Sequence, residues 1–266
     1  MAIGLIIIGD EILSGKRSDK HFAKVIEILA ARGLQLGWAE IIGDDRERIT
    51  ATLRRTLAGT DIVLCCGGIG ATPDDHTRQC AAAALGVPLE LQPEAKRLIQ
   101  ERIADMARAG NVPADFDAPE NLQRLKMGEF PQGAAIVPNP YNQIPGFALY
   151  PGSSRAHYFA PGFPVMAWPM IEWALDTHHA GLFHRDTRLE QSVLLFDAME
   201  STITPLMEAV EADFPGTKVF SLPSVGDAVT RRHIELGVKG EAQQAAPAFE
   251  RLLAGLDRLG IAWQRH

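Results

Sequence analysis

The stretch VLCCGGIGATPDDHT, residues 63–77, combines a short apolar run with three closely spaced glycines and two adjacent aspartates. Glycines let backbone N–H groups approach an anion such as a phosphate, and the hydroxyl of Thr72 could add a donor. Asp74 and Asp75 would repel a bare phosphate. A cation such as Mg²⁺ would remove this conflict, because hard cations bridge carboxylates and phosphate oxygens. Either aspartate alone could instead be the N-cap of the following helix.

Two further loops repeat this combination of residues. The first, GDEILSGK at residues 9–16, follows an apolar run and contains Asp10, Glu11, Ser14, Gly15 and Lys16. Lys16 is the evident cation for a phosphate, although a plain polar turn explains the loop as well. The second contains Asp44 and Asp45 at the start of an amphipathic segment, where helix capping alone would account for both.

The elements that must position these loops alternate between strand and helix. Hydrophobic patterns predict strands at 3–8, 34–42 and 61–66, and helices at 22–30, 44–57 and 77–85. Such alternation predicts right-handed crossovers and a doubly wound, mostly parallel sheet. Ligands of such α/β sheets bind beyond the carboxyl ends of the strands. The three loops are therefore expected at one edge of the sheet.

The rest of the chain predicts a helical hairpin, short strands and a second domain. We expect helix, loop and helix over 93–121, strands in the Pro/Gly-rich segment 134–164, and a helix at 166–175. Composition changes near residue 180, and we divide the chain into domains 1–180 and 181–266. In the second, we expect strand 189–196, helix 201–214, strands 217–222 and 231–238, and helix 245–259, a small α+β module of split-βαβ type.

Composition narrows the functional classes. The 266 residues are 46% hydrophobic and 22% charged, with a net charge of −7 and no basic stretch, so nucleic acid is not an expected partner. The loop at 67–77 lacks the Gly-Lys-Ser/Thr ending of a Walker A motif and does not match GxGxxG. The apolar N-terminal run is too short for a signal peptide or membrane span.

The three cysteines predict a reducing compartment. Cys65 and Cys66 lie in an apolar run and are expected to act as small buried hydrophobes, while Cys80 falls in a helical pattern. There is no CxxC spacing, so a disulfide framework is not expected. We therefore expect a cytoplasmic protein.

Five segments occur in an order that resembles a known family: IGDEILSG, GDD, GGIGATPDDHT, PNPYNQIPGFAL and PGFPVM. Over residues 2–170 the chain resembles the MoaB/Mog-type molybdopterin-binding fold, and more narrowly the N-terminal domain of CinA-type competence/damage-inducible proteins. The segment beyond residue 185 is similar to the small KH-like module that follows in those proteins. The sequence contains no counterpart of their amidohydrolase domain, so we do not expect deamidation of nicotinamide mononucleotide.

The resemblance implies a three-layer α/β fold with the site at the carboxyl end of the sheet. It implies metal-binding and catalytic roles for Asp44, Asp74 and Asp75. It places ligand or phosphate binding on Asp10, Glu11, Ser14, Gly15, Gly67, Gly68, Gly70, Thr72, Thr77, Pro138, Asn139, Gly146 and Gly162.

The activity implied by the resemblance is metal-dependent cleavage of the pyrophosphate in ADP-ribose-like dinucleotides, with Mg²⁺, Co²⁺ or Mn²⁺. One alternative is a molybdopterin-binding protein or molybdopterin adenylyltransferase of molybdenum cofactor metabolism. Another is a non-catalytic pterin- or nucleotide-binding protein, favoured by Val165 and Trp168, which replace the glutamate and lysine usual in CinA-type sequences. Proteins of this family often form dimers or trimers, so we expect a homo-oligomer.

Overall fold

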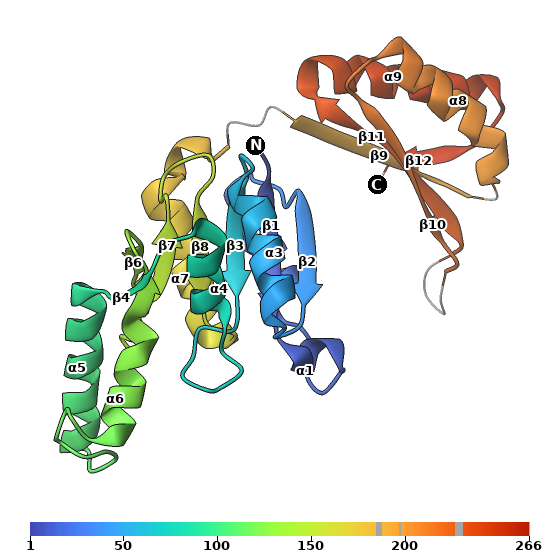
Figure 1. Cartoon of the computed structure of the whole chain (residues 1–266). Coiled ribbons are helices and arrows are strands. Elements are labelled where there is room, and N and C mark those ends of the chain that lie inside the picture. Colours follow the sequence, from blue (N-terminus) through green and yellow to red (C-terminus); the bar gives the residue numbers. More distant parts are fainter. Residues whose placement is uncertain (185–187, 197, 227–230, 266) are drawn as a thin grey trace. The chain divides into compact units, whose positions relative to one another are not determined.

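The computed structural model describes residues 1–184, 188–196, 198–226 and 231–265 (Figure 1). The chain divides into two compact units, Met1–Phe183 and His184–His266. The boundary therefore lies within a few residues of position 180, where the composition changes. Each unit has its own hydrophobic core and is described by itself.

The first unit is built on a sheet with the strand order β2-β1-β3-β8-β7-β6. Its strands are β1 (Ile3–Ile8), β2 (Trp38–Ile42), β3 (Ile62–Cys66), β6 (Ala135–Val137), β7 (Gly146–Leu149) and β8 (His157–Ala160). The neighbours β2, β1, β3 and β8 are parallel, and β7 is antiparallel to both β8 and β6. The expected mostly parallel α/β sheet is thus confirmed.

Helices cover both faces of this sheet. They are α1 (Asp10–Leu13), α2 (His21–Ala30), α3 (Arg46–Leu57), α4 (Thr77–Leu85), α5 (Pro93–Arg108), α6 (Pro119–Leu125) and α7 (Pro164–His178). Short 3₁₀ turns lie at Lys126–Gly128 and Ala180–Leu182, and β4 (Leu89–Leu91) pairs with β5 (Glu129–Pro131). The α5–α6 hairpin projects from the rest of the unit in Figure 1.

The apolar strands are buried on both faces because side chains alternate along a strand. In β1, Leu5 and Ile7 pack with α2 and α7, whereas Ile6 and Ile8 pack with α3 and α4. The adjacent cysteines of β3 divide in the same way between the two cores and are fully buried. A continuous apolar run is therefore what a central strand of a three-layer fold requires.

The second strand and the first loop differ from the sequence-based expectation, and β4 and β5 were not predicted. The strand predicted at 34–42 begins only at Trp38, whose partner on β1 is Gly4, although the Gly37 N–H still donates to the Ile3 carbonyl at 2.8 Å. Leu34 and Leu36 pack against the core outside the strand. In the first loop, Asp10 begins the short helix α1, where the sequence predicts only a turn.

In the second unit, the described residues form one antiparallel sheet and two helices. The sheet has the order β10-β11-β9-β12, with β9 (Arg188–Leu195), β10 (Lys218–Ser224), β11 (His233–Glu241) and β12 (Trp263–Arg265). The helices are α8 (Glu200–Asp213) and α9 (Ala242–Arg258). The sequence pattern did not predict β12, whose three residues pair with β9. Within the described part of the chain, no helix has the length and apolar character needed to cross a membrane.

Candidate functional site

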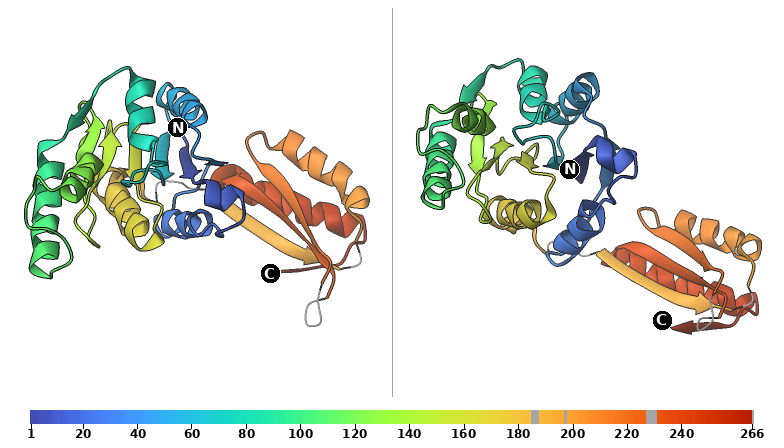
Figure 2. Two further views of the ribbon diagram at one scale, coloured as in Figure 1. Left: turned by 60° about the horizontal axis from the view of Figure 1, so that its bottom comes forward. Right: turned by 90° about the horizontal axis from the view of Figure 1, so that it is seen from below.

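The predicted loops lie at one edge of the first sheet. Strands β1, β2, β3 and β8 are parallel neighbours, so the segments that follow them leave the sheet at the same edge. The loop between β6 and β7 reaches this edge too, because β6 runs parallel to β8 across the intervening antiparallel strand. This carboxyl edge is at the bottom of the first unit in Figure 1, and the right panel of Figure 2 looks onto it.

The glycine turn after β3 depends on the absence of side chains. Gly67 and Gly68 have φ angles of 112° and 67°, in the region that favours glycine. A Cβ on Gly67 would lie 2.1 Å from the carbonyl oxygen of Ile8, and one on Gly68 would lie 2.2 Å from Thr77 Oγ1. Buried Thr77 fixes the turn, since its hydroxyl donates to the Gly67 carbonyl (3.1 Å) and its N–H to the Gly68 carbonyl (2.9 Å).

Asp75 shapes the second half of this loop. Its Oδ2 accepts hydrogen bonds from the backbone N–H of Thr72 at 2.8 Å and from the Thr72 hydroxyl at 2.5 Å. The same oxygen lies 2.6 Å from the position that a Cβ on Gly70 would take. Asp74, by contrast, is exposed. The two adjacent aspartates therefore differ: Asp75 organises the turn and Asp74 faces solvent.

The loops after β1 and β2 are joined by Asp10 and Asp44. The N–H of Asp10 donates to Asp44 Oδ2 at 2.8 Å, and the N–H of Asp44 donates to Asp10 Oδ1 at 3.2 Å. Burial raises the pKa of Asp44, and the negative charges of Asp10, Glu11 and Asp74 raise it further. Asp45 has a different role, because its Oδ1 accepts from the Arg48 N–H at 2.7 Å and caps α3.

The resemblance implies that some of these carboxylates bind a divalent cation. No group of three or more His, Cys, Asp or Glu side chains is close enough to hold a metal ion among the residues that the structure describes. Asp44, Asp74 and Asp75 therefore do not form a preassembled three-ligand site. Mg²⁺ commonly binds one or two carboxylates and takes its remaining ligands from water and substrate phosphates. In that mode Asp44 and Asp74 would be the protein ligands, because the charges of Asp10, Glu11 and Asp74 all act on Asp44 and raise its pKa.

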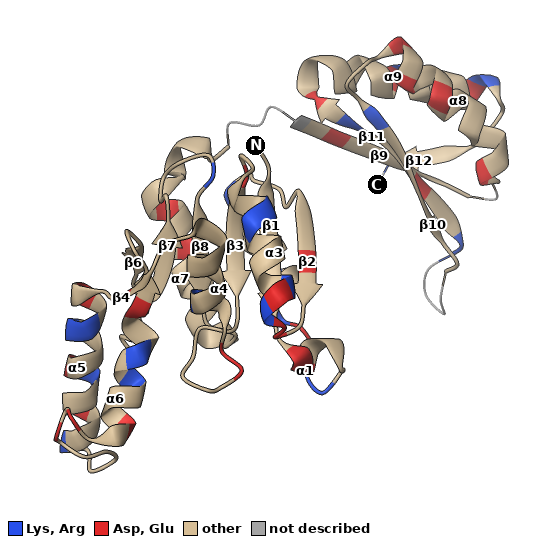
Figure 3. Cartoon of the chain, viewed as in Figure 1, with Lys and Arg blue, Asp and Glu red and all other residues tan. Residues whose placement is uncertain are grey.

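The remaining residues of the first loop are open to solvent. Ser14 is exposed, and Gly15 has a φ of 73° with nothing within 4 Å of an added Cβ. The carboxylate of Glu11 instead folds back toward Gly9, where an added Cβ would lie 2.6 Å from Oε2. Figure 3 shows acidic residues on α1 and on the loop after β3, at the same edge.

The residues predicted to border the site lie on the adjoining loops. Asn139 is 4% exposed, follows half-buried Pro138, and holds the β6–β7 loop together through its amide group. A Cβ on Gly146 would meet the Phe159 carbonyl oxygen at 2.1 Å, so Gly146 allows close packing in the sheet rather than ligand contact. Gly162 lies against the glycine turn, with 3.6 Å between its added Cβ and the Gly67 Cα.

Arg78 is a residue that the sequence analysis missed. It is 3% exposed in the first turn of α4. Its Nη2 donates to the Gly70 carbonyl at 2.5 Å, and its Nη1 donates to the carbonyl of Lys126 beyond α6. Gln123 on α6 donates to the neighbouring Ala71 carbonyl at 3.1 Å. The signal in the sequence was a lone charged residue in the otherwise uncharged helical run TRQCAAAAL.

His21 is a second such residue. It is 4% exposed at the start of α2, and its Nε2 lies 3.0 Å from the Gly162 carbonyl oxygen. Asp19 caps this helix start through the N–H groups of His21 (2.8 Å) and Phe22 (2.9 Å). The segment 18–21 (SDKH) thus connects the start of α2 to the loop that follows β8.

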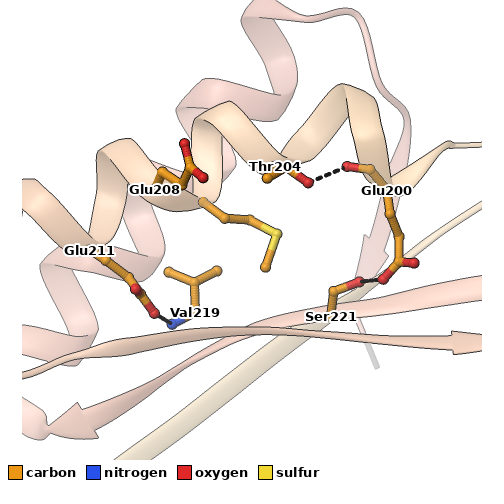
Figure 4. A pocket seen from close by; sticks show the side chains of 7 residues that line it. Glu200, Thr204, Glu208, Glu211, Val219 and Ser221 are labelled. Carbon is orange, nitrogen blue, oxygen red and sulfur yellow. Dashed lines mark hydrogen bonds between the residues drawn. The ribbon is translucent and has the colours of Figure 1, made fainter.

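The second unit contains a shallow pocket of about 340 Å³ between α8 and β10 (Figure 4). Two of its glutamates join these two elements. Glu200 accepts from the Ser221 hydroxyl at 2.6 Å, and Glu211 accepts from the Val219 N–H at 2.8 Å. This pocket therefore serves the packing of the unit, and the chemistry-bearing residues named above lie on the first unit.

A mostly parallel α/β sheet covered by helices on both faces defines a three-layer α/β protein, and the glycine turn and acidic loops lie at the carboxyl edge, where such sheets bind their ligands. Residues 4–180 match the family model described as "Probable molybdopterin binding domain", and the chain belongs to this family. The resemblance to the MoaB/Mog and CinA-type proteins is thereby confirmed.

Individual relatives agree with this assignment. A CinA-like protein of Anaeromyxobacter sp. (strain Fw109-5) is 30% identical over 98% of this chain, which spans 66% of that relative's length. Protein Ta0487 of Thermoplasma acidophilum is 26% identical over 96% of this chain and 93% of its own. The crystal structure of the protein CinA from T. acidophilum superposes with a TM-score of 0.55 at 25% identity, covering 66% of this chain and 96% of that one.

Proposed function

We propose that the first unit binds a phosphate-containing nucleotide at its carboxyl edge and, with a divalent cation, cleaves the pyrophosphate bond of ADP-ribose-like dinucleotides. The observation that carries this proposal is the meeting of three loops. The glycine turn after β3 lies beside the loops that Asp10 and Asp44 join. A cytoplasmic setting belongs to the same proposal, in keeping with three free, buried cysteines.

The turn supplies the phosphate-binding part. The left-handed conformations of Gly67 and Gly68 turn the backbone sharply, and successive N–H groups in such turns form anion-binding concavities. The N–H of Gly67 donates to the Ala160 carbonyl at 3.0 Å and that of Thr72 donates to Asp75, so the amides between these two residues would bind the phosphate. The hydroxyls of Thr72 and Thr77 are already bound to Asp75 and Gly67. Their role in this proposal is to keep the turn rigid, so that the backbone amides need little reorganisation when they bind phosphate oxygens.

The acidic loops supply the cation-binding part. Asp44 and Asp74 would hold the ion, and Asp10 would keep Asp44 in position through its two hydrogen bonds. A bound divalent cation offsets negative charge on phosphate oxygens and can lower the pKa of a bound water. Glu11 and Asp10 contribute negative potential that strengthens cation binding and disfavours a phosphate without its metal.

Two other functions use the same residues. A molybdopterin adenylyltransferase would transfer an adenylate group instead of hydrolysing the anhydride, and the family to which the chain belongs favours a pterin ligand. A non-catalytic nucleotide- or pterin-binding protein would need only the turn and the cation. Catalysis would then fail while ligand binding persisted.

The deciding experiment is a substrate panel of ADP-ribose, FAD, NAD and ATP, with and without Mg²⁺, Mn²⁺ or Co²⁺, followed by product chromatography. We expect AMP from ADP-ribose only when a divalent cation is present, and loss of this product in Asp44→Asn. Turnover that needs both ATP and molybdopterin would favour the transferase. Binding of these compounds without any product would overturn cleavage and leave the binding function.

A further inference from the structure

Large apolar side chains are exposed around the carboxyl edge. On its loops and helix starts, five side chains have exposed fractions between 45% and 60%: Leu13, Phe22, Tyr141, Phe163 and Val165. A single exposed apolar residue is common on a protein surface. A set of them on the loops of one candidate site is typical of a binding surface.

Phe163 is held close to the glycine turn. It follows Gly162, whose added Cβ would be 3.6 Å from the Gly67 Cα and whose carbonyl oxygen lies 3.0 Å from His21 Nε2. The carbonyl of Phe163 also accepts the N–H groups of Met166 (3.0 Å) and Ala167 (2.9 Å) at the start of α7. The backbone is thus fixed on both sides of a side chain that remains 55% exposed.

Tyr141 is presented by a buried amide. Asn139 Oδ1 accepts the N–H of Tyr141 at 3.1 Å, while its Nδ2 donates to Asn142 Oδ1 at 2.8 Å and to the Ile144 carbonyl at 3.0 Å. Asn139 is 4% exposed, whereas Tyr141 is 60% exposed. The buried amide of Asn139 therefore orders this loop, and the ring of Tyr141 remains exposed to solvent.

The two aromatic loops adjoin each other. Asn142 Nδ2 lies 3.7 Å from Met166 Sδ, which connects the β6–β7 loop to the first turn of α7. Strand β7 also pairs with β8 as far as Phe147 and Phe159, so the preceding loop leaves the sheet beside the loop after β8.

We propose that Tyr141 and Phe163 bind the planar heterocycle of the ligand whose phosphates lie at the glycine turn. This inference rests on the proposed function and adds the residues that select a ring-bearing ligand. Neighbouring strands are about 5 Å apart, so the loops of β8 and of β7–β6 lie roughly 5 Å and 10–15 Å from the turn on β3. An extended nucleotide covers a comparable distance, and its base has the flat apolar faces that aromatic side chains stack on.

The test compares ligands with and without a ring. In the full chain with Mg²⁺, titration calorimetry would measure the Kd of ADP-ribose, AMP and a soluble pterin, and of ring-free pyrophosphate and ribose 5-phosphate. We expect Tyr141→Ala and Phe163→Ala each to raise the Kd of the best ring-bearing probe about tenfold, with the Kd of ring-free probes unchanged. Tyr141→Phe should keep wild-type affinity, because it retains the ring.

A matched control is Tyr150→Ala. Tyr150 is 39% exposed in the turn after β7, at the opposite edge of the sheet, and should not affect any Kd. Equal loss of ring-free and ring-bearing probes in Tyr141→Ala would overturn the inference. So would unchanged affinity in both alanine variants, a change confined to oligomeric state, or a wild type that binds neither adenine nor pterin.

Failure of the two proposals would look different. Ring-dependent weakening of binding without product formation would leave this inference standing and overturn pyrophosphate cleavage. Metal-dependent cleavage that is unchanged in both alanine variants would support pyrophosphate cleavage and overturn the role given to Tyr141 and Phe163.

Discussion

Asp10 and Asp44 each donate a backbone N–H to the other's carboxylate, although 34 residues separate them in the sequence. These two hydrogen bonds hold the loops after β1 and β2 together. It also leaves Asp44 partly buried beside other carboxylates, which raises its pKa. Such an arrangement is unfavourable for the protein alone and favourable once a cation is present.

The first prediction concerns this pair. Asp44→Asn keeps an acceptor oxygen for the Asp10 N–H but removes the charge. We expect unchanged or slightly higher thermal stability without metal, loss of the stabilisation produced by Mg²⁺, and loss of at least tenfold in any metal-dependent activity. Thermal unfolding with and without Mg²⁺ measures the first two.

Asp45→Ala is the control for that experiment. It removes the cap of α3 and should cost about 1 kcal/mol of stability while leaving the Mg²⁺ effect intact. Equal effects of Mg²⁺ on Asp44→Asn and the wild type would contradict the role given to Asp44.

A second prediction concerns the glycine turn. Gly67→Ala places a Cβ against the Ile8 carbonyl, a backbone atom that cannot move without disturbing β1. We expect a large loss of stability together with loss of ligand binding. Gly15→Ala is the comparison, since its φ of 73° is also positive, although lower than the 112° of Gly67, and there is open space around the Cβ, so it should cost only about 1–2 kcal/mol. Gly68→Ala has a φ of 67°, close to that of Gly15, but a Cβ 2.2 Å from Thr77 Oγ1, so urea unfolding of this pair would show how much the contact adds to the cost of φ.

The third prediction tests Arg78 as a positioning residue. Arg78→Met leaves the carbonyls of Gly70 and Lys126 without their buried donor, each worth about 1–3 kcal/mol. We expect faster amide hydrogen exchange both in the loop after β3 and around α6, with partial recovery in Arg78→Lys. Arg54→Met, at an exposed position of α3, should change neither region. Faster exchange in only one of these regions would contradict the role of Arg78 in joining the loop after β3 to the segment after α6.

A fourth prediction concerns acid stability. Burial lowers the pKa of His157 and of His179 to about 4, and both rings are hydrogen-bonded in the folded protein. Between the ordinary histidine pKa of 6.5 and about 4, the unfolded chain binds more protons than the folded one. Stability should therefore be full above about pH 6.5 and fall as the pH drops toward 4.

This dependence can be assigned by substitution. The melting temperature would be measured from pH 7.5 to 4.5 for the wild type, His179→Gln and His184→Gln. We expect the melting temperature of His179→Gln to fall less steeply with decreasing pH, because glutamine does not bind a proton at this position. His184→Gln replaces an exposed residue and should follow the wild type. Parallel curves for all three proteins would contradict the role of His179.

The sequence alone predicted the carboxyl-edge arrangement. Apolar runs ending in glycine or aspartate, alternating with amphipathic helices, allow few topologies, because crossovers between parallel strands are short and right-handed. The same local patterns identified the glycine turn, the cap at Asp45 and the last helix, which is α9. These features depend on residues close together in the chain.

Only the tertiary structure decided which polar groups face which. Asp75 and Asp74 are neighbours in sequence, yet one closes the turn through Thr72 and the other faces solvent. The partners of Asp10 and Arg78 lie 34 and 48 residues away, and β12 forms only because β9 offers it an edge. Whether two polar groups from distant segments form a hydrogen bond depends on differences of a few tenths of an ångström in their separation. No local pattern encodes them, and packing of the whole unit sets them.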